Sequence, residues 1–431
     1  MITGVPAGSS LADWPISYAD LAPDYERAEW EVGVAGDSPG AARHWPRGKG
    51  YPLPPLRISP QGALLRAGAS KLGWDAFGVS ALINTAPYGG RAACIQCQYC
   101  VGMPCPVDAK NGAHNTMIAR AVASGRCELL TECVVDQITS DAAGHVTGVS
   151  YFDPAGRLQS ATAEVVICAG GAIETARLLL LSANDQHPHG LGNDYDQVGR
   201  HLQGHTYPMA VAVMPEPVYD GLGPGMSTVT VEFNHGNDGI VGGSMMTDDL
   251  IEIPIRFWQH YLPPDIPRWG AAAKEFMRAD FKRSMRVTGP VQEIPNPEAR
   301  VTLDPKVRDR WGRPVARLSG AMHPETLRTS EFMLRREMEW LKAAGAERVW
   351  GKMPSLKLSA GQHQAGTCRM GDDPKTSVLN KWNQSHDIKN LFVVDGSSFV
   401  TGGTQNPTMT ILALAMRASE YLAEEMRKGN V

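Results

Sequence analysis

Four cysteines crowd into the stretch CIQCQYCVGMPCP, which covers residues 94–106. They are Cys94, Cys97, Cys100 and Cys105, and a proline directly follows the last of them. Bacterial ferredoxins bind iron–sulfur clusters with the spacing C-x2-C-x2-C-x3-C-P. The last gap here is one residue longer, and structural zinc sites usually take their cysteines from two separated pairs. An iron–sulfur cluster and four reduced thiols therefore both remain open, and zinc fits the spacing less well.

A second group of chemically useful residues lies near the C-terminus. His363 opens the stretch HQAGTCRMG, in which the small residues Ala365 and Gly366 would let a flat ligand approach the backbone. Asn406 and Pro407 precede a long run with helical periodicity, so we expect Asn406 as its N-cap and Pro407 as its first residue. An imidazole titrates near neutral pH and can take a proton from a hydroxyl group.

Composition narrows the classes of protein to which the chain can belong. Its 431 residues are 43% hydrophobic and 20% charged, which is ordinary for a globular protein of two or three domains. A net charge of −4 without basic runs predicts no nucleic-acid partner. No run is long and apolar enough to predict a membrane span, and the N-terminus has no signal-peptide pattern. The default expectation is therefore a cytoplasmic protein, with a periplasmic or membrane-associated location through a partner left open.

The helices and strands that must position these residues follow an α/β pattern at both ends of the chain and an antiparallel β pattern in the middle. Helices are expected within residues 18–33 and 57–73, and a buried strand, a double-glycine turn and an apolar helix within 164–182. Residues 206–320 read as short strands of an antiparallel sheet, including one at 251–258. An amphipathic helix over 325–345 follows, and the tail returns to α/β style. This order predicts one domain inserted into another.

Six segments together resemble the glucose–methanol–choline (GMC) family of flavin-dependent oxidoreductases. In chain order they are WPISYADLAPDYERAE, ICAGGAIETARLLLLS, VGRHLQGH, HQAGTCRMG, NLFVVDGSSF and TQNPTMTILALA. The resemblance implies an α/β (mixed α+β) fold, in which an antiparallel substrate domain is inserted into a three-layer FAD-binding domain. The expected divisions are a connecting region at 1–90, FAD-binding parts at 91–205 and 356–431, and a substrate domain at 206–355.

The resemblance also implies roles for individual residues. His363 would be the base toward the substrate hydroxyl, and Asn406 would hydrogen-bond the same oxygen. FAD would be the cofactor, and the residues implied to contact it are Val135, Ala169, Gly170, Asp395, Gly396, Asn406, Pro407 and Thr408. Some multi-subunit sugar dehydrogenases of the family carry an iron–sulfur cluster on a comparable cysteine loop, which makes Cys94, Cys97, Cys100 and Cys105 candidate ligands. His201 and His205 have helical i, i+4 spacing, but they fall within VGRHLQGH and are expected to be structural.

The chain departs from the family pattern in one respect. No G-x-G-x-x-G turn after a strand is present, although the family uses one to hold the FAD pyrophosphate. We therefore expect an incomplete FAD-binding domain, a separate N-terminal polypeptide or upstream segment, and weak flavin affinity and stability for this chain alone.

The sequence thus predicts an FAD-dependent oxidoreductase that acts on the CH–OH group of an alcohol, polyol, sugar or sugar acid. An electron acceptor or redox subunit would be its partner. The alternative is a noncatalytic subunit whose cysteine loop binds an iron–sulfur cluster or no metal.

Overall fold

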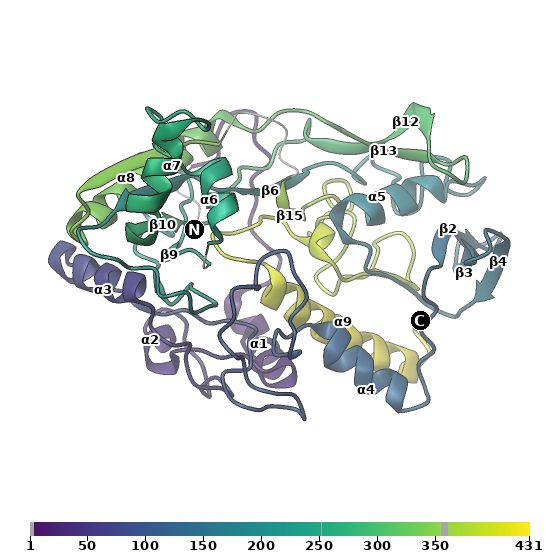
Figure 1. The fold of residues 1–431 in the computed structure, drawn as a ribbon. Coiled ribbons are helices and arrows are strands. Elements are labelled where there is room, and N and C mark those ends of the chain that lie inside the picture. The colour runs from purple at the N-terminus through teal and green to yellow at the C-terminus, as the bar shows by residue number, and fades with distance from the viewer. Residues whose placement is uncertain (1–3, 251, 355–360) are drawn as a thin grey trace.

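The computed structural model describes residues 4–250, 252–354 and 361–431. A six-stranded antiparallel sheet forms one half of the molecule, on the left of Figure 1. Its strands, in spatial order, are β1 (Phe77–Gly78), β8 (Thr228–Thr230), β9 (Met246–Asp248), β10 (Ser284–Thr288), β7 (Met209–Val213) and β14 (Arg348–Lys352). Five of these strands lie within 206–355, and β1 comes from the N-terminal region.

Helices cover both faces of this sheet because side chains along a strand alternate between faces. Ala210 and Ala212 of β7 pack in a cluster with residues of α8 (Pro324–Ala343) and α3 (Pro60–Leu72). Val211 and Val213 point the other way, into a cluster with α6 (Pro254–His260) and α7 (Ala271–Ala279). Small residues on one face and larger ones on the other let two layers of helices approach the same strand.

The other half contains a parallel pair of strands, β5 (Val166–Cys168) and β16 (Leu391–Val393). The helix α5 (Gly171–Leu181) follows β5 directly, and an antiparallel meander extends to the right in Figure 1. The meander consists of β2 (Val134–Ser140), β3 (Val146–Phe152) and β4 (Leu158–Thr162). The first helix, α1 (Tyr18–Val32), packs against the last, α9 (Thr408–Lys428).

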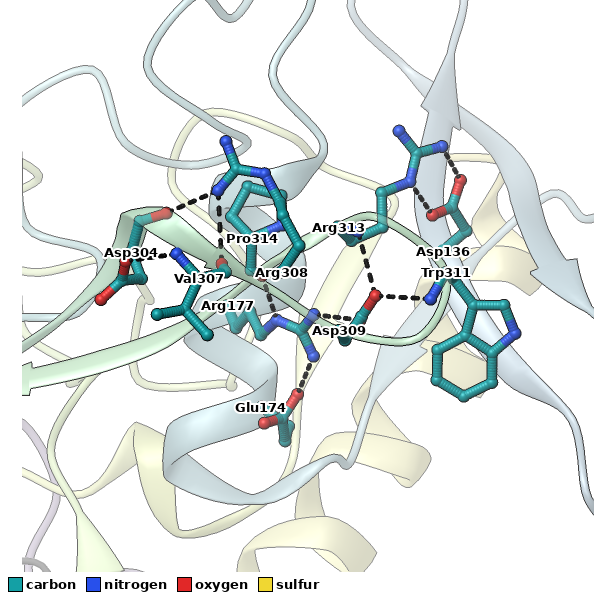
Figure 2. A network of polar contacts seen from close by, with 10 residues as sticks. All are labelled: Asp136, Glu174, Arg177, Asp304, Val307, Arg308, Asp309, Trp311, Arg313 and Pro314. Atoms are coloured by element: carbon teal, nitrogen blue, oxygen red, sulfur yellow. Dashed lines mark hydrogen bonds and ion pairs between the residues drawn. The ribbon is translucent and has the colours of Figure 1, made fainter.

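A long hairpin, β12 (Arg300–Arg308) and β13 (Pro314–Ser319), is fastened to this half by ion pairs (Figure 2). Arg313 donates from Nε and Nη2 to the two oxygens of Asp136 on β2, at 2.5 and 2.6 Å. Arg177 on α5 donates to Asp309 at 2.6 Å and to the Pro314 carbonyl at 2.8 Å. The hairpin tip therefore ties β2 and α5 together.

A small sheet joins the two halves, and its strands β6 and β15 lie between them in Figure 1. It consists of β11 (Val291–Gln292), β6 (Gln203–Thr206) and β15 (Gln362–Ala365). Shorter elements complete the fold: α2 (Ser38–Ala42), η1 (Ala113–Asn115), α4 (Met117–Ala123), η2 (Phe281–Arg283) and η3 (Gly396–Ser398).

The structure corrects some expectations. The predicted strand at 251–258 is wrong, since α6 occupies Pro254–His260; residue 251 lies outside the described residues. Alternating apolar residues suggested a strand there, but Pro254 sits at the first helical turn, where its missing N–H costs nothing. The expected three-layer domain was an incomplete one, and its parallel sheet has two strands within the described ranges. No helix in those ranges has the length and apolarity needed to cross a bilayer.

Candidate active site

His363 occupies a β-bulge in the small joining sheet. Gln362 pairs with His205 and Ala365 pairs with Gln203, so β15 contains one more residue than β6 over the same stretch. His363 takes up this extra length with a φ of 58°, in the left-handed region. A bulge of this kind redirects a side chain and is frequent beside active sites.

The bulge brings the His363 ring against two residues of the neighbouring segment. His363 Nδ1 lies 2.8 Å from Nδ1 of His205 and 3.0 Å from the Tyr207 hydroxyl. The two imidazole rings are nearly perpendicular, at 83°, with centroids 5.0 Å apart. Among the described residues, no hydrogen-bond partner is found for His363 Nε2. One ring nitrogen is thus held by the protein, and the other can meet a ligand.

Burial keeps this cluster neutral. It lowers the pKa of His363, and together with the nearby His363 it lowers the pKa of His205 to about 4. Burial, and then the charge of Asp249, raise the pKa of the Tyr207 hydroxyl. The His363 ring is therefore neutral at neutral pH, with one nitrogen protonated and the other able to accept a proton, which is the state that a base requires.

Hydrogen bonds link the cluster to the loop that leads into α9. His205 Nε2 lies 3.1 Å from the Gly403 carbonyl, and Gln203 donates to the Val400 carbonyl and accepts from the Gly402 amide. Asn406, three residues after Gly403, is exposed. Among the described residues no hydrogen bond joins Asn406 to His363, and the two are related through His205 and this loop.

The expected helix cap differs from the observed one. The helix α9 begins at Thr408, Pro407 is its N-cap, and no side chain caps it. Asn406 therefore lies one position before the cap, and the Pro407 carbonyl accepts the first helical hydrogen bond, from the Ile411 amide at 3.0 Å. The first amides of α9 consequently have no side-chain cap and suit an anionic ligand group.

Asp395 connects the turn between β5 and α5 to the start of η3. Its carboxylate accepts from the Gly171 amide at 2.9 Å, the Thr175 hydroxyl at 2.5 Å and the Ser397 amide at 2.8 Å. Gly396 follows at the start of η3 and is buried. Asp395 thus holds the β5–α5 turn against η3, a supporting position that leaves little of its carboxylate for a ligand.

The surface beside β5 combines exposed backbone with exposed apolar residues. Ala169 and Gly170 are exposed directly after this strand. The apolar residues Val135 and Ile167 are 44% and 48% exposed. Apolar side chains and accessible backbone of this kind suit the adenosine part of FAD.

The four cysteines of the loop line one pocket with Ile83, Tyr99 and Lys110. Burial and the other thiols raise the pKa of Cys100 to about 11, whereas at Cys105 burial is outweighed by hydrogen bonds from backbone amides, which lower the pKa of that thiol. The Ala109 amide donates to Cys105 Sγ at 3.3 Å, and the Gln96 amide donates to Cys94 Sγ at 3.3 Å. No three Cys, His, Asp or Glu side chains in the described ranges are grouped to bind a metal ion. The iron–sulfur prediction therefore finds no support in the geometry.

Two segments of the chain match the family described as GMC oxidoreductase, over residues 54–207 and 295–415. A 2-methyl-1,2-propanediol dehydrogenase from Mycolicibacterium austroafricanum is 32% identical over 95% of this chain and 74% of its own length. The chain belongs to the GMC oxidoreductase family. The resemblance seen in the sequence is thereby confirmed, while the missing dinucleotide segment stays a prediction.

Other GMC relatives agree with this assignment. The large subunit of a fructose dehydrogenase from Gluconobacter japonicus is 27% identical over 97% of this chain and 76% of its own length. The solved structure of pyridoxine 4-oxidase from Mesorbium loti has a TM-score of 0.59 and 18% identity, covering 98% of this chain and 82% of that chain. At that identity the structural likeness supports the fold alone, which is the mixed α/β fold of GMC structures.

Sequence reasoning missed the partners of His363. His205 was considered only with His201 on a shared helical face, but residues 203–206 form a strand and His201 instead contacts the Ser10 hydroxyl at 2.7 Å. Tyr207 was not considered. The only signal was the position of both residues in or beside VGRHLQGH, and nothing local indicates a contact across 158 positions of the chain.

Proposed function

We propose that this GMC protein oxidises the CH–OH group of a small alcohol, polyol or sugar, with His363 as the base. The observation that carries the proposal is the arrangement of His363, which is neutral, anchored at Nδ1 and without a partner at Nε2 among the described residues. The named substrates of the two relatives, a diol and a sugar, support the substrate class.

In this proposal, His363 Nε2 accepts the hydroxyl proton of the substrate. An alcohol releases the hydride from its carbon more easily when its O–H proton leaves as well, since negative charge on oxygen weakens the C–H bond. Asn406 would donate a hydrogen bond to the same oxygen and hold it as charge develops. Exposure of Asn406 at the start of α9 is compatible with this role.

The residues that would hold FAD lie at two places. Val135, Ala169 and Gly170 would face the adenosine, and the uncapped start of α9 at Pro407 and Thr408 would face the flavin. Asp395 and Gly396 would support the cofactor indirectly, because the Asp395 carboxylate already holds the Gly171 and Ser397 amides in place. FAD, when bound, supplies the acceptor for the hydride.

The division of the chain follows the same proposal. Residues 206–355 would form the substrate domain, between FAD-binding parts at 91–205 and 356–431, with 1–90 as the connecting region. The relative named as a large subunit supports a redox partner that takes up the electrons.

The test is reduction of a dye acceptor by a panel of alcohols, polyols and sugars, using the purified chain supplied with FAD. We expect His363→Ala to lower kcat on the order of 100-fold to 10,000-fold without loss of bound FAD. Asn406→Ala should lower it on the order of 100-fold. The exposed control His145→Ala should change neither quantity.

Two results would contradict the proposal. Full activity in His363→Ala would remove the base assignment. Bound FAD without dye reduction by any member of the panel would instead favour a noncatalytic subunit.

A further inference from the structure

We propose that His205 is a positioning residue that fixes the tautomer of His363, so that Nδ1 carries the proton and Nε2 presents the lone pair. The catalytic consequence rests on the proposed function. The tautomer itself is a property of this chain and is measurable without any substrate or cofactor.

The assignment starts from the far side of His205. Its Nε2 lies 3.1 Å from the carbonyl oxygen of Gly403, which can only accept a hydrogen bond, so Nε2 must carry a proton. Burial lowers the pKa of His205 to about 4, so this ring holds a single proton at neutral pH. Its Nδ1 is therefore an acceptor.

The role of His363 Nδ1 as hydrogen-bond donor then follows from the role of His205 Nδ1. His363 Nδ1 lies 2.8 Å from this acceptor, so it must be the donor and carry the proton of the neutral ring. The Tyr207 oxygen, at 3.0 Å from the same Nδ1, is a second acceptor for that proton. With one proton on Nδ1, the lone pair of His363 is on Nε2.

The opposite tautomer is disfavoured by the contact with His205, whereas the Tyr207 hydroxyl can donate or accept and fits either tautomer. If the proton were on Nε2, two lone pairs would face each other across 2.8 Å, and a part-buried acceptor would lose its donor. Such a ring would present an N–H to a substrate hydroxyl and could not take its proton. The carbonyl of Gly403, acting through His205, thus determines which nitrogen of His363 is basic.

This arrangement also suits the state after proton transfer. In that step the substrate O–H bond breaks and an Nε2–H bond forms, so both nitrogens of His363 then carry protons. The Nδ1–H still has its acceptor on His205, and no other proton needs to move. The site can therefore change protonation without rearranging its hydrogen bonds.

The tautomer can be read by 15N NMR of the full chain with labelled histidine, in which the His363 signals are identified by their loss in His363→Gln. We expect a protonated Nδ1 and an unprotonated Nε2 at neutral pH in the wild type. His205→Phe removes the acceptor and should shift the population toward the Nε2–H form. His205→Asn places an amide oxygen near the position of Nδ1 and should restore the wild-type pattern. The exposed control His145→Phe should leave the His363 signals unchanged.

The outcomes separate this inference from the proposed function. An Nε2–H tautomer in the wild type overturns it, and so does an unchanged tautomer in a folded His205→Phe; should that variant unfold, the wild-type spectrum decides. In the dye assay we expect His205→Phe to lower kcat on the order of tenfold or more and His205→Asn to recover most of it. Full activity in His363→Ala beside the expected spectrum would instead reject the base assignment and leave the tautomer standing.

Discussion

At the scale of single residues, the site depends on how closely two strands approach. Gly366 follows β15 with a φ of 92°, and a Cβ built on it would lie 2.3 Å from the His201 carbonyl oxygen. The sequence suggested that this small residue admits a ligand, but its neighbour is the backbone before β6. Close approach here lets His363 and His205 meet.

We predict that Gly366→Ala destabilises the protein by well over 1 kcal/mol and separates β6 from β15, because it combines a left-handed backbone with a collision against backbone. The matched control is Gly156→Ala, where φ is 77° but a Cβ meets nothing within 4 Å. That variant should show backbone strain alone, about 1 kcal/mol. Urea unfolding measures both, and equal losses would show that the contact with His201 is unimportant.

At the scale of elements, the hairpin of Figure 2 holds β2 and α5 by two arginines in different surroundings. The Asp136 side chain is 1% exposed and takes a two-pronged contact from Arg313. The Glu174 side chain, which pairs with Arg177, is 58% exposed. Buried charge-assisted pairs of this geometry contribute far more than exposed ones.

We therefore predict that Asp136→Asn lowers the free energy of unfolding by about 2 kcal/mol, since it leaves the guanidinium of Arg313 facing an amide. Glu174→Gln should change it by less than about 0.5 kcal/mol. Urea denaturation followed by circular dichroism would compare them. A Glu174→Gln loss as large as that of Asp136→Asn would mean that exposure does not set the contribution of these pairs.

The sequence predicted most of these elements and few of the contacts between them. Helices at α1, α3, α8 and α9 were found because apolar periodicity and glycine caps are local signals. The strand predicted over 251–258 is wrong because the alternation of apolar residues indicated a strand, whereas Pro254 stands in the first turn of a helix. His363 was found as a candidate from its motif, but its anchoring by His205 and Tyr207 depends on a bulge register that spans distant segments. Such a register is set by tertiary packing.

At the scale of the whole molecule, buried carboxyl groups make stability depend on pH. Burial raises the pKa of Glu293 to about 7, and it raises that of Glu337 on α8 well above the usual value. Neither oxygen of Glu337 has a hydrogen bond of normal geometry within the described residues. A raised folded-state pKa means that stability is fully present below the unfolded pKa, near 4.5, and is lost as pH rises through the folded pKa.

We predict that Glu337→Gln matches the wild type near pH 4 and becomes more stable above it, by about 1.4 kcal/mol per pH unit up to the folded pKa of Glu337. Glu339→Gln, on the same helix with a side chain 41% exposed, should show no such divergence. Thermal unfolding from pH 4 to pH 8 gives the comparison. Parallel curves for Glu337→Gln and the wild type would show that Glu337 titrates normally.

The packing of α1 against α9 has a consequence for how the protein is made. Tyr25 on α1 reaches Thr410 on α9, with 2.5 Å between their hydroxyl oxygens, and Leu21 and Leu414 belong to one buried cluster. The ribosome produces α1 well before α9, because most of the described chain lies between these two helices. Until α9 has been made, the side of α1 that packs against it stays exposed, and chaperones that shield apolar surfaces on nascent chains can bind it during that interval.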